Sequence, residues 1–216
     1  RAYQKVLETE ILPVARPPER AGVSNLPDGE ACYAGLVQRY TTLDTSPDAV
    51  HQAGIEAIAR VHAEFRELGL RVFETDDLQS IFTKLREAPE LRFESAQQVE
   101  DKARAAVAAA NAAVPQAFGR LPEARCEVDR IPDHEAPFTT IAYYMQAVPP
   151  SADDPGRPGT YYVNTHAPET RPRHEAEALA WHEAVPGHHL QIAIARELPD
   201  MPAFRRFGGM TAFVEG

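Results

Sequence analysis

The chain has 216 residues, of which 44% are hydrophobic and 25% charged, and its formal net charge at pH 7 is −10. This composition is typical of globular proteins and excludes the fibrous and disordered classes. The negative charge disfavours binding to nucleic acid and to anionic membrane surfaces. The chain contains no apolar run long enough to cross a bilayer, so no membrane span is predicted within it.

The first part of the chain, residues 1–122, is predicted to be a helical scaffold. Apolar residues recur there at helical spacing, and proline or glycine ends each run. Ser46 and Ser95 are candidate N-caps. The expected helices cover residues 3–12, 30–40, 47–68, 76–87 and 95–114. The third of them has a candidate core face made of Val50, Ile58, Val61 and Phe65.

The second part, residues 123–216, changes its periodicity. Residues 126–131, 141–148 and 160–164 are short, rich in β-branched or aromatic side chains and bounded by turn residues, which predicts three strands. With 149–159 as a hairpin loop, they predict a small antiparallel sheet. Helical spacing returns over 173–197, is interrupted at Pro186-Gly187, and begins again at Thr211 after a loop over 199–209.

The expected fold is therefore α+β and mainly helical, with a small sheet beside a kinked helix. Both parts are expected to form one continuous catalytic domain. The chain begins at Arg1 and stops at Gly216, just after a helix has started, which suggests a domain truncated at both ends. Its two cysteines, Cys32 and Cys126, allow at most one disulfide between them.

The kinked helix carries a cluster of histidine and glutamate residues. A zinc hydrolase needs imidazoles that converge on one metal ion and a carboxylate that takes a proton from water. His182-Glu183 supplies the first half of such a motif. In the common version the second histidine follows four residues after the first, and that position here is Pro186.

Geometry indicates how a later histidine could still reach the metal. On a straight helix His188 would lie about 240° around the axis from His182, and His189 about 10.5 Å along it. Pro186 cannot continue a regular helix, and Gly187 permits unusual backbone angles. A local bulge could therefore return either His188 or His189 to the metal.

Glu215, at the start of the last predicted helix, is the best candidate for a third protein ligand. Glu183 would then be the general base. The competing interpretation is a plain structural helix with solvated histidines, which is the expectation for His174. A kinked, histidine-rich helix nevertheless carries a conformational cost that a plain scaffold helix has no reason to bear.

The strand before this helix offers candidate substrate contacts. Ordinary sheet packing would explain its aromatic residues. Alternatively, one phenol could stabilise the oxyanion of a tetrahedral intermediate. Tyr162 is the candidate for that catalytic role, Tyr161 and Asn164 are candidates for binding substrate, and His166 is a further possible donor.

Three blocks of the sequence, 161–165, 181–191 and 211–216, resemble in order the bacterial family known as domain of unknown function 885. The segments 26–30 and 41–42 fit it as well. The resemblance implies a large, mainly helical fold with a cleft, related to zincin-type metallopeptidases whose third ligand is a downstream glutamate. It favours His182, His188 and Glu215 as ligands, with His188 preferred over His189. Members of the family are longer than this chain.

The resulting hypothesis is a zinc-dependent metallopeptidase that cleaves peptide bonds with Glu183 as general base. Two alternatives remain at this point. One is a zinc esterase or amidase acting on a small molecule, and the other is a metal-free helical module that binds peptides and has lost catalysis.

Overall fold

A computed structural model describes residues 1–148, 153 and 155–215 of the chain. The fold is α+β and mainly helical, as predicted, with one three-stranded sheet in the described residues. The chain divides into two compact units, Arg1–His62 together with the last residues, and Ala63–Val214. The change from helices to strands that the sequence predicted at residue 122 lies within the second unit.

The first unit is helical and sparsely packed. Of its described residues up to His62, only Gly29 and Val37 are buried. Its elements are α1 (Ala2–Val6), η1 (Leu7–Ile11), η2 (Leu12–Val14), η3 (Pro18–Arg20), η4 (Val23–Asn25), α2 (Gly29–Thr41) and the first part of α3 (Pro47–Phe73).

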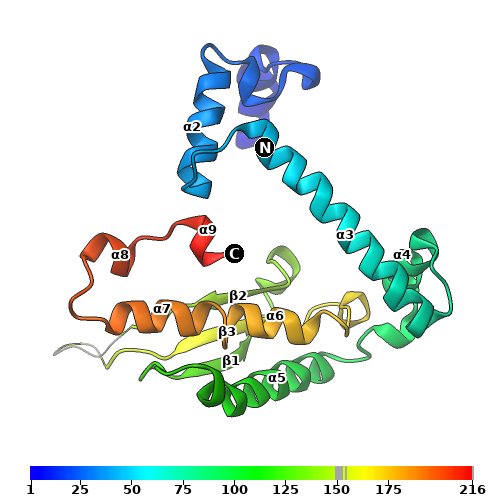
Figure 1. Ribbon diagram of the computed structural model, residues 1–216, viewed down its shortest axis with the longest axis vertical. Helices are drawn as coiled ribbons and strands as arrows, with labels where there is room; N and C mark the ends of the chain where they lie inside the picture. The colour runs from blue at the N-terminus through cyan, green and yellow to red at the C-terminus, as the bar shows by residue number, and fades with distance from the viewer. Residues whose placement is uncertain (149–152, 154, 216) are drawn as a thin grey trace. The chain divides into compact units, whose positions relative to one another are not determined.

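The second unit contains the sheet and the helices that cover it (Figure 1). Its remaining elements are α4 (Leu78–Glu87), η5 (Pro89–Leu91), α5 (Ala96–Ala117), β1 (Cys126–Arg130), η6 (Ala136–Phe138), β2 (Ala142–Met145), β3 (Gly159–Val163), η7 (Pro168–Thr170), α6 (Ala176–Glu183), α7 (His188–Glu197), α8 (Ala203–Phe207) and α9 (Thr211–Val214).

The expected core face of α3 is largely exposed. Val50, Ile58 and Val61 retain 40%, 53% and 46% of their accessible surface. Phe65, further along the helix, instead makes an edge-to-face contact with Phe82 of α4, with ring centroids 5.2 Å apart. Periodicity correctly predicted the helix, but it does not reveal whether another element packs on its apolar face.

The sheet is mixed rather than wholly antiparallel. β3 is the central strand, antiparallel to β2 as a hairpin predicts, but parallel to β1. The connection from β1 to β2 is about ten residues long, too long for a tight turn, and β3 lies between the two strands. Residues 149–152 and 154 of the predicted loop 149–159 lie outside the described residues, and Val148 and Arg157 form a backbone bridge.

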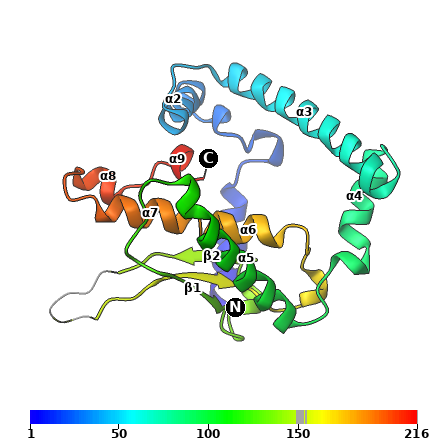
Figure 2. The same cartoon turned by 60° about the horizontal axis from the view of Figure 1, so that its bottom comes forward.

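One face of the sheet supports the main core. Side chains alternate along β3, so Gly159, Tyr161 and Val163 are buried on that face. α5 and α6 pack there, and together they bury Val99, Val107 and Ala180 against the strands. Figure 2 shows α5 and α6 over the same side of the sheet. This packing fixes α6, which ends at Glu183, relative to the strands.

Candidate metal centre

A wide turn replaces the predicted kinked helix. α6 ends at Glu183 and α7 begins at His188, and the Val185–Pro186 peptide bond between them is cis. The Gly187 amide donates to the Trp181 carbonyl at 2.8 Å, spanning six residues where a regular α-helix spans four. The backbone between the two histidines therefore forms a wider turn than a regular α-helix would.

Gly187 is required by this turn. A Cβ atom added there would lie 1.8 Å from the carbonyl oxygen of His182 and 2.5 Å from that of Trp181. Real Cβ atoms do not approach backbone oxygens so closely, so the two segments pass each other only because residue 187 has no side chain.

The turn brings the His182 and His188 imidazoles together. Their ring centroids are 4.4 Å apart and the ring planes are inclined by 69°. His182 is exposed and His188 half-buried. On a straight helix the two rings would point in different directions, so the two residues inserted into the motif are accommodated by the backbone as predicted.

Glu215, which directly follows α9, completes a group of three potential ligands. One nitrogen from each of His182 and His188 and one carboxylate oxygen of Glu215 all lie within 4.8 Å of one another. Two ligands about 2.1 Å from a tetrahedral zinc ion are about 3.4 Å apart, so small side-chain rotations would suffice to close the group around an ion. Two imidazoles and a carboxylate are a donor set that suits zinc.

His189, the alternative ligand, points into the protein. It is 2% exposed, its Nε2 lies 3.0 Å from the carbonyl oxygen of Ala124, and its Nδ1 lies 2.9 Å from the Tyr144 hydroxyl. The carbonyl can only accept, so Nε2 carries the proton and Nδ1 accepts from Tyr144. Burial lowers the pKa of His189, which favours the neutral ring. Both nitrogens are occupied, so His189 is a structural residue and not a ligand.

α7 is therefore fixed at both ends against the loop before β1. The His189 contact holds its first turn, and in its last turn the Glu197 carboxylate accepts hydrogen bonds from the amides of Glu123 and Ala124 at 3.0 and 3.1 Å. Gly159 belongs to the same arrangement, because a Cβ there would lie 2.6 Å from His189 Nδ1. These contacts fix the first turn of α7, from which the side chain of His188 leaves about 100° around the helix from that of His189.

Glu183, the candidate base, is half-buried directly after His182. The negative charge of Glu183 acts on the phenol of Tyr161, a residue that is 1% exposed. Burial and, to a lesser degree, the negative charge of Glu183 raise the pKa of the Tyr161 phenol, so this group stays neutral beside the carboxylate. Tyr161 was predicted to contact substrate, but its burial makes it part of the core that packs against α6.

Tyr162 lies on the opposite face of the sheet from Tyr161. Its ring stacks on that of Tyr143, its partner in β2, with centroids 5.0 Å apart. The structure does not bring this phenol together with the histidine pair, because α6 packs on the other face. Strand alternation could have assigned Tyr161, rather than Tyr162, to the side of the helix.

Asn164 and His166 also lie apart from the metal group. Asn164 is 0% exposed, and its amide nitrogen lies within 2.8–3.2 Å of the carbonyl oxygens of Ala136, Thr139 and Thr140. Its side-chain oxygen accepts from the His166 amide. Asn164 thus holds the β1–β2 connection in place, and sequence reasoning missed this role because the partners are backbone groups distant in the chain.

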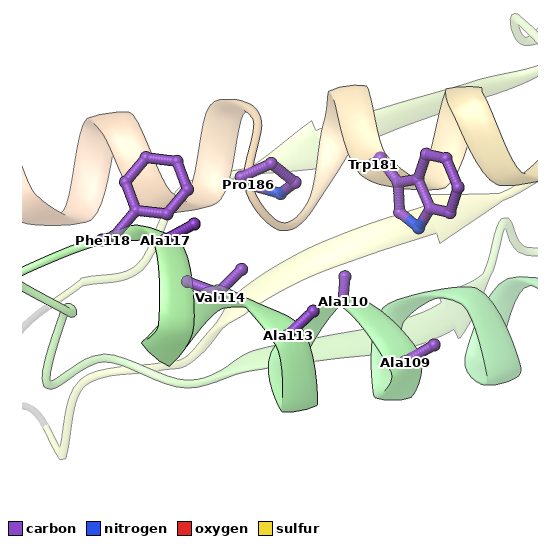
Figure 3. A pocket seen from close by; sticks show the side chains of 8 residues that line it. All are labelled: Ala109, Ala110, Ala113, Val114, Ala117, Phe118, Trp181 and Pro186. Atoms are coloured by element: carbon purple, nitrogen blue, oxygen red, sulfur yellow. The ribbon is translucent and has the colours of Figure 1, made fainter.

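A purely apolar cavity of about 370 Å³ lies between the second half of α5 and the α6–α7 turn. Figure 3 shows Trp181 and Pro186 facing α5, with Phe118 at one end. Trp181 also donates its indole N–H to the Ala106 carbonyl at 3.3 Å. The cavity carries no titratable side chain, so it supports the turn without supplying chemistry to the histidines.

The sequence profile of the family described as "Bacterial protein of unknown function (DUF885)" matches residues 1–216. The chain is also similar to "the putative lipoprotein from Colwellia psychrerythraea", whose crystal structure superposes with a TM-score of 0.85 at 25% sequence identity. That match covers 100% of this chain and 37% of the Colwellia chain. No functionally curated protein matches the sequence. None of the described helices combines the length and apolarity needed to cross a bilayer.

Proposed function

Because the chain belongs to the bacterial family of proteins of unknown function DUF885, we propose from its own geometry that it is a zinc-dependent hydrolase, a zincin-like metallopeptidase. The observation that carries the proposal is the convergence of His182, His188 and Glu215 within 4.8 Å. Three protein ligands leave one coordination position open, which is the arrangement of catalytic rather than structural zinc sites.

A zinc ion bound there would supply a Lewis acid that polarises the substrate carbonyl and acidifies water. The side chains of the protein would transfer the protons. Glu183 is one residue from His182, and its carboxylate can take a proton from the attacking water and deliver it to the departing amine. Tyr161, buried in the core with α6, stays neutral near this carboxylate.

Access to the group is compatible with turnover. His182 and Glu215 are exposed and His188 is half-buried, so a substrate can reach the ligands from solvent. The anchoring of α7 through His189 and Glu197 keeps the His188 side of the group rigid, which a preorganised site requires.

The test measures metal content and peptide hydrolysis in the same samples. We expect about one zinc per chain by elemental analysis, lost in His182→Ala and in His188→Ala. Glu183→Gln should keep the metal and lower kcat by at least about 10²-fold, because it removes only the base. Glu177→Gln, on the same helix but in an exposed ion pair with Lys102, is the matched control and should retain both properties.

Two results would contradict the proposal. Undiminished hydrolysis by Glu183→Gln would remove the assigned base, and unchanged zinc content in both histidine variants would place the metal elsewhere. A panel of peptides and esters separates a peptidase from the esterase alternative.

A further inference from the structure

A second cavity, of about 670 Å³, lies within the second unit between α7 and the segment from Phe204 to Val214. α7 lines it with Gln191, Ile192, Ala195 and Arg196, and α8 and the following residues form the opposite wall. Three phenylalanines, Phe204, Phe207 and Phe213, belong to that wall. The cavity is thus built largely from a helix of the candidate metal centre and from the chain that leads to Glu215.

The lining of this cavity is positively charged. Arg196, Arg205 and Arg206 contribute to it, and none of its lining residues is acidic. The whole chain carries a net charge of −10, so the sign of the charge at this cavity is opposite to that of the chain as a whole. A wall with three guanidinium groups and no carboxylate favours an anionic ligand.

Two of these arginines carry unsatisfied donors. Arg196 Nε and Arg206 Nε are buried and, within the described residues, have no hydrogen-bond partner. A buried donor of a charged group that makes no hydrogen bond is costly. Such a donor calls for an acceptor. A carboxylate is a natural one, because its two oxygens accept from a guanidinium in parallel.

The guanidinium groups are held in position. Arg196 Nη1 donates to the Ala147 carbonyl at 3.1 Å, and Arg206 Nη2 donates to the Arg196 carbonyl at 2.7 Å. Both groups also lie near the Phe207 ring, with centroid distances of 5.8 and 5.2 Å. Preorganised cations of this kind bind an anion with less loss of side-chain entropy.

The cavity begins within one turn of a candidate metal ligand. Gln191 lies three residues after His188 on α7, hence on a neighbouring part of its surface, and its side-chain amide donates to the Phe213 carbonyl across the cavity mouth. Arg196 lies eight residues beyond His188, about 12 Å along the helix axis. That distance is about the length of three to four residues of extended peptide.

We propose that this cavity is a subsite for a carboxylate of a peptide substrate whose scissile bond lies at the His182–His188 pair. The proposal rests on the proposed hydrolase function and adds a substrate class to it. The carboxylate can be the C-terminus of a short peptide or an acidic side chain a few residues from the scissile bond, and both would meet Arg196 and Arg206.

The test compares four peptides of one sequence, each with a free or an amidated C-terminus and with a glutamate or a glutamine at the third or fourth residue from the cleavage site. We expect kcat/KM to be at least about tenfold higher for the peptides with the recognised carboxylate. If the free C-terminus raises kcat/KM, the recognised carboxylate is the terminus. If the glutamate raises it, the recognised carboxylate is the side chain.

Variants then connect this preference to the cavity. Arg196→Gln and Arg206→Gln should each remove most of the preference, measured as the ratio of kcat/KM for the charged and the uncharged peptide. Arg71→Gln, exposed on α3, is the matched loss of one positive charge and should not change this ratio. The peptide comparison in the unsubstituted protein remains decisive if an arginine variant fails to fold.

Equilibrium binding of the same peptides separates the two proposals. Turnover without any preference for a carboxylate would overturn the subsite and leave the hydrolase function intact. Carboxylate-dependent binding that is lost in the arginine variants, without turnover of any peptide, would support the subsite and overturn the hydrolase function. Binding that ignores the carboxylate, without turnover, would overturn both.

Discussion

Cys32 and Cys126 show how burial changes the chemistry of one residue type. Both are free thiols, Cys32 exposed and Cys126 partly buried beneath α5 and α7. Burial raises the pKa of the Cys126 thiol from 9.0 to about 12, with a smaller contribution from the charge of Glu127. Since the thiolate is the reactive species, the two cysteines should differ strongly in reactivity.

At pH 8 we expect an alkylating reagent to modify Cys32 in the folded chain and to modify Cys126 only after denaturation. Peptide mass spectrometry with and without denaturant measures both sites, and Cys32→Ser isolates the second one. Equal labelling rates of the two thiols in the folded chain would contradict the prediction.

The same shift makes stability depend on pH. The folded pKa of Cys126 lies above the value of an exposed thiol, so the folded state binds more protons between pH 9 and about 12. Its contribution is therefore fully present below pH 9 and is lost as the pH rises through that range. Cys126→Ala should reduce the decline in the free energy of unfolding over that interval.

At the scale of an element, the α6–α7 turn is decided by one glycine. Gly187→Ala places a methyl group against the His182 carbonyl, which must move because the Cβ would lie 1.8 Å from it. We expect a loss of about 1–3 kcal/mol in the free energy of unfolding, the usual cost of overpacking, and a lower zinc affinity because His188 is displaced from His182.

Gly119→Ala is the matched control, because its Cβ would meet no atom within 4 Å. Denaturant unfolding and zinc titration of both variants measure the two effects. A Gly187→Ala protein that keeps parental stability and zinc affinity would show that the turn tolerates a side chain and is not held by the close approach.

The α6–α7 turn also shows how much of the candidate site could be predicted from the sequence. Proline and glycine inside a histidine-rich helix predicted an interruption, and helical geometry showed that it had to bulge for His188 to meet His182. The choice between His188 and His189 could not be made from spacing, because it depends on Tyr144 and the carbonyl of Ala124, both distant in the sequence. α8, within the predicted loop 199–209, was missed because its five residues span fewer than two turns, too few for an apolar repeat to show.

The prediction of the sheet was also limited to features that neighbouring residues encode. Periodicity predicted all three strands, and the β2–β3 hairpin followed from chain order. The parallel pairing of β1 with β3 depends on a connection that Asn164 holds through three backbone carbonyls, and no local pattern encodes it. The side of the sheet that carries Tyr161 could have been predicted once the covering helices were assigned to a face.

At the scale of the whole molecule, the proposed ion would join distant parts of the sequence. His182 and His188 flank the turn between α6 and α7, while Glu215 follows α9, so one ion would connect the α6–α7 turn to a segment 27 residues beyond His188 (215 − 188 = 27). A ligand that binds the folded state alone stabilises it by mass action, and metal sites assembled from separated residues show this coupling strongly.

Free zinc at about 100 times its dissociation constant should therefore stabilise the chain by about 2.7 kcal/mol. For a protein of this size that corresponds to a rise in Tm of about 5–10 °C, read by calorimetry at matched ionic strength. Magnesium, which prefers oxygen ligands, should have little effect at the same concentration. His182→Ala should remove the zinc response, because it leaves a single imidazole and one carboxylate. An equal rise in the parent and in this variant would mean that zinc stabilises the protein through other residues, and the assigned ligands would then have to be abandoned.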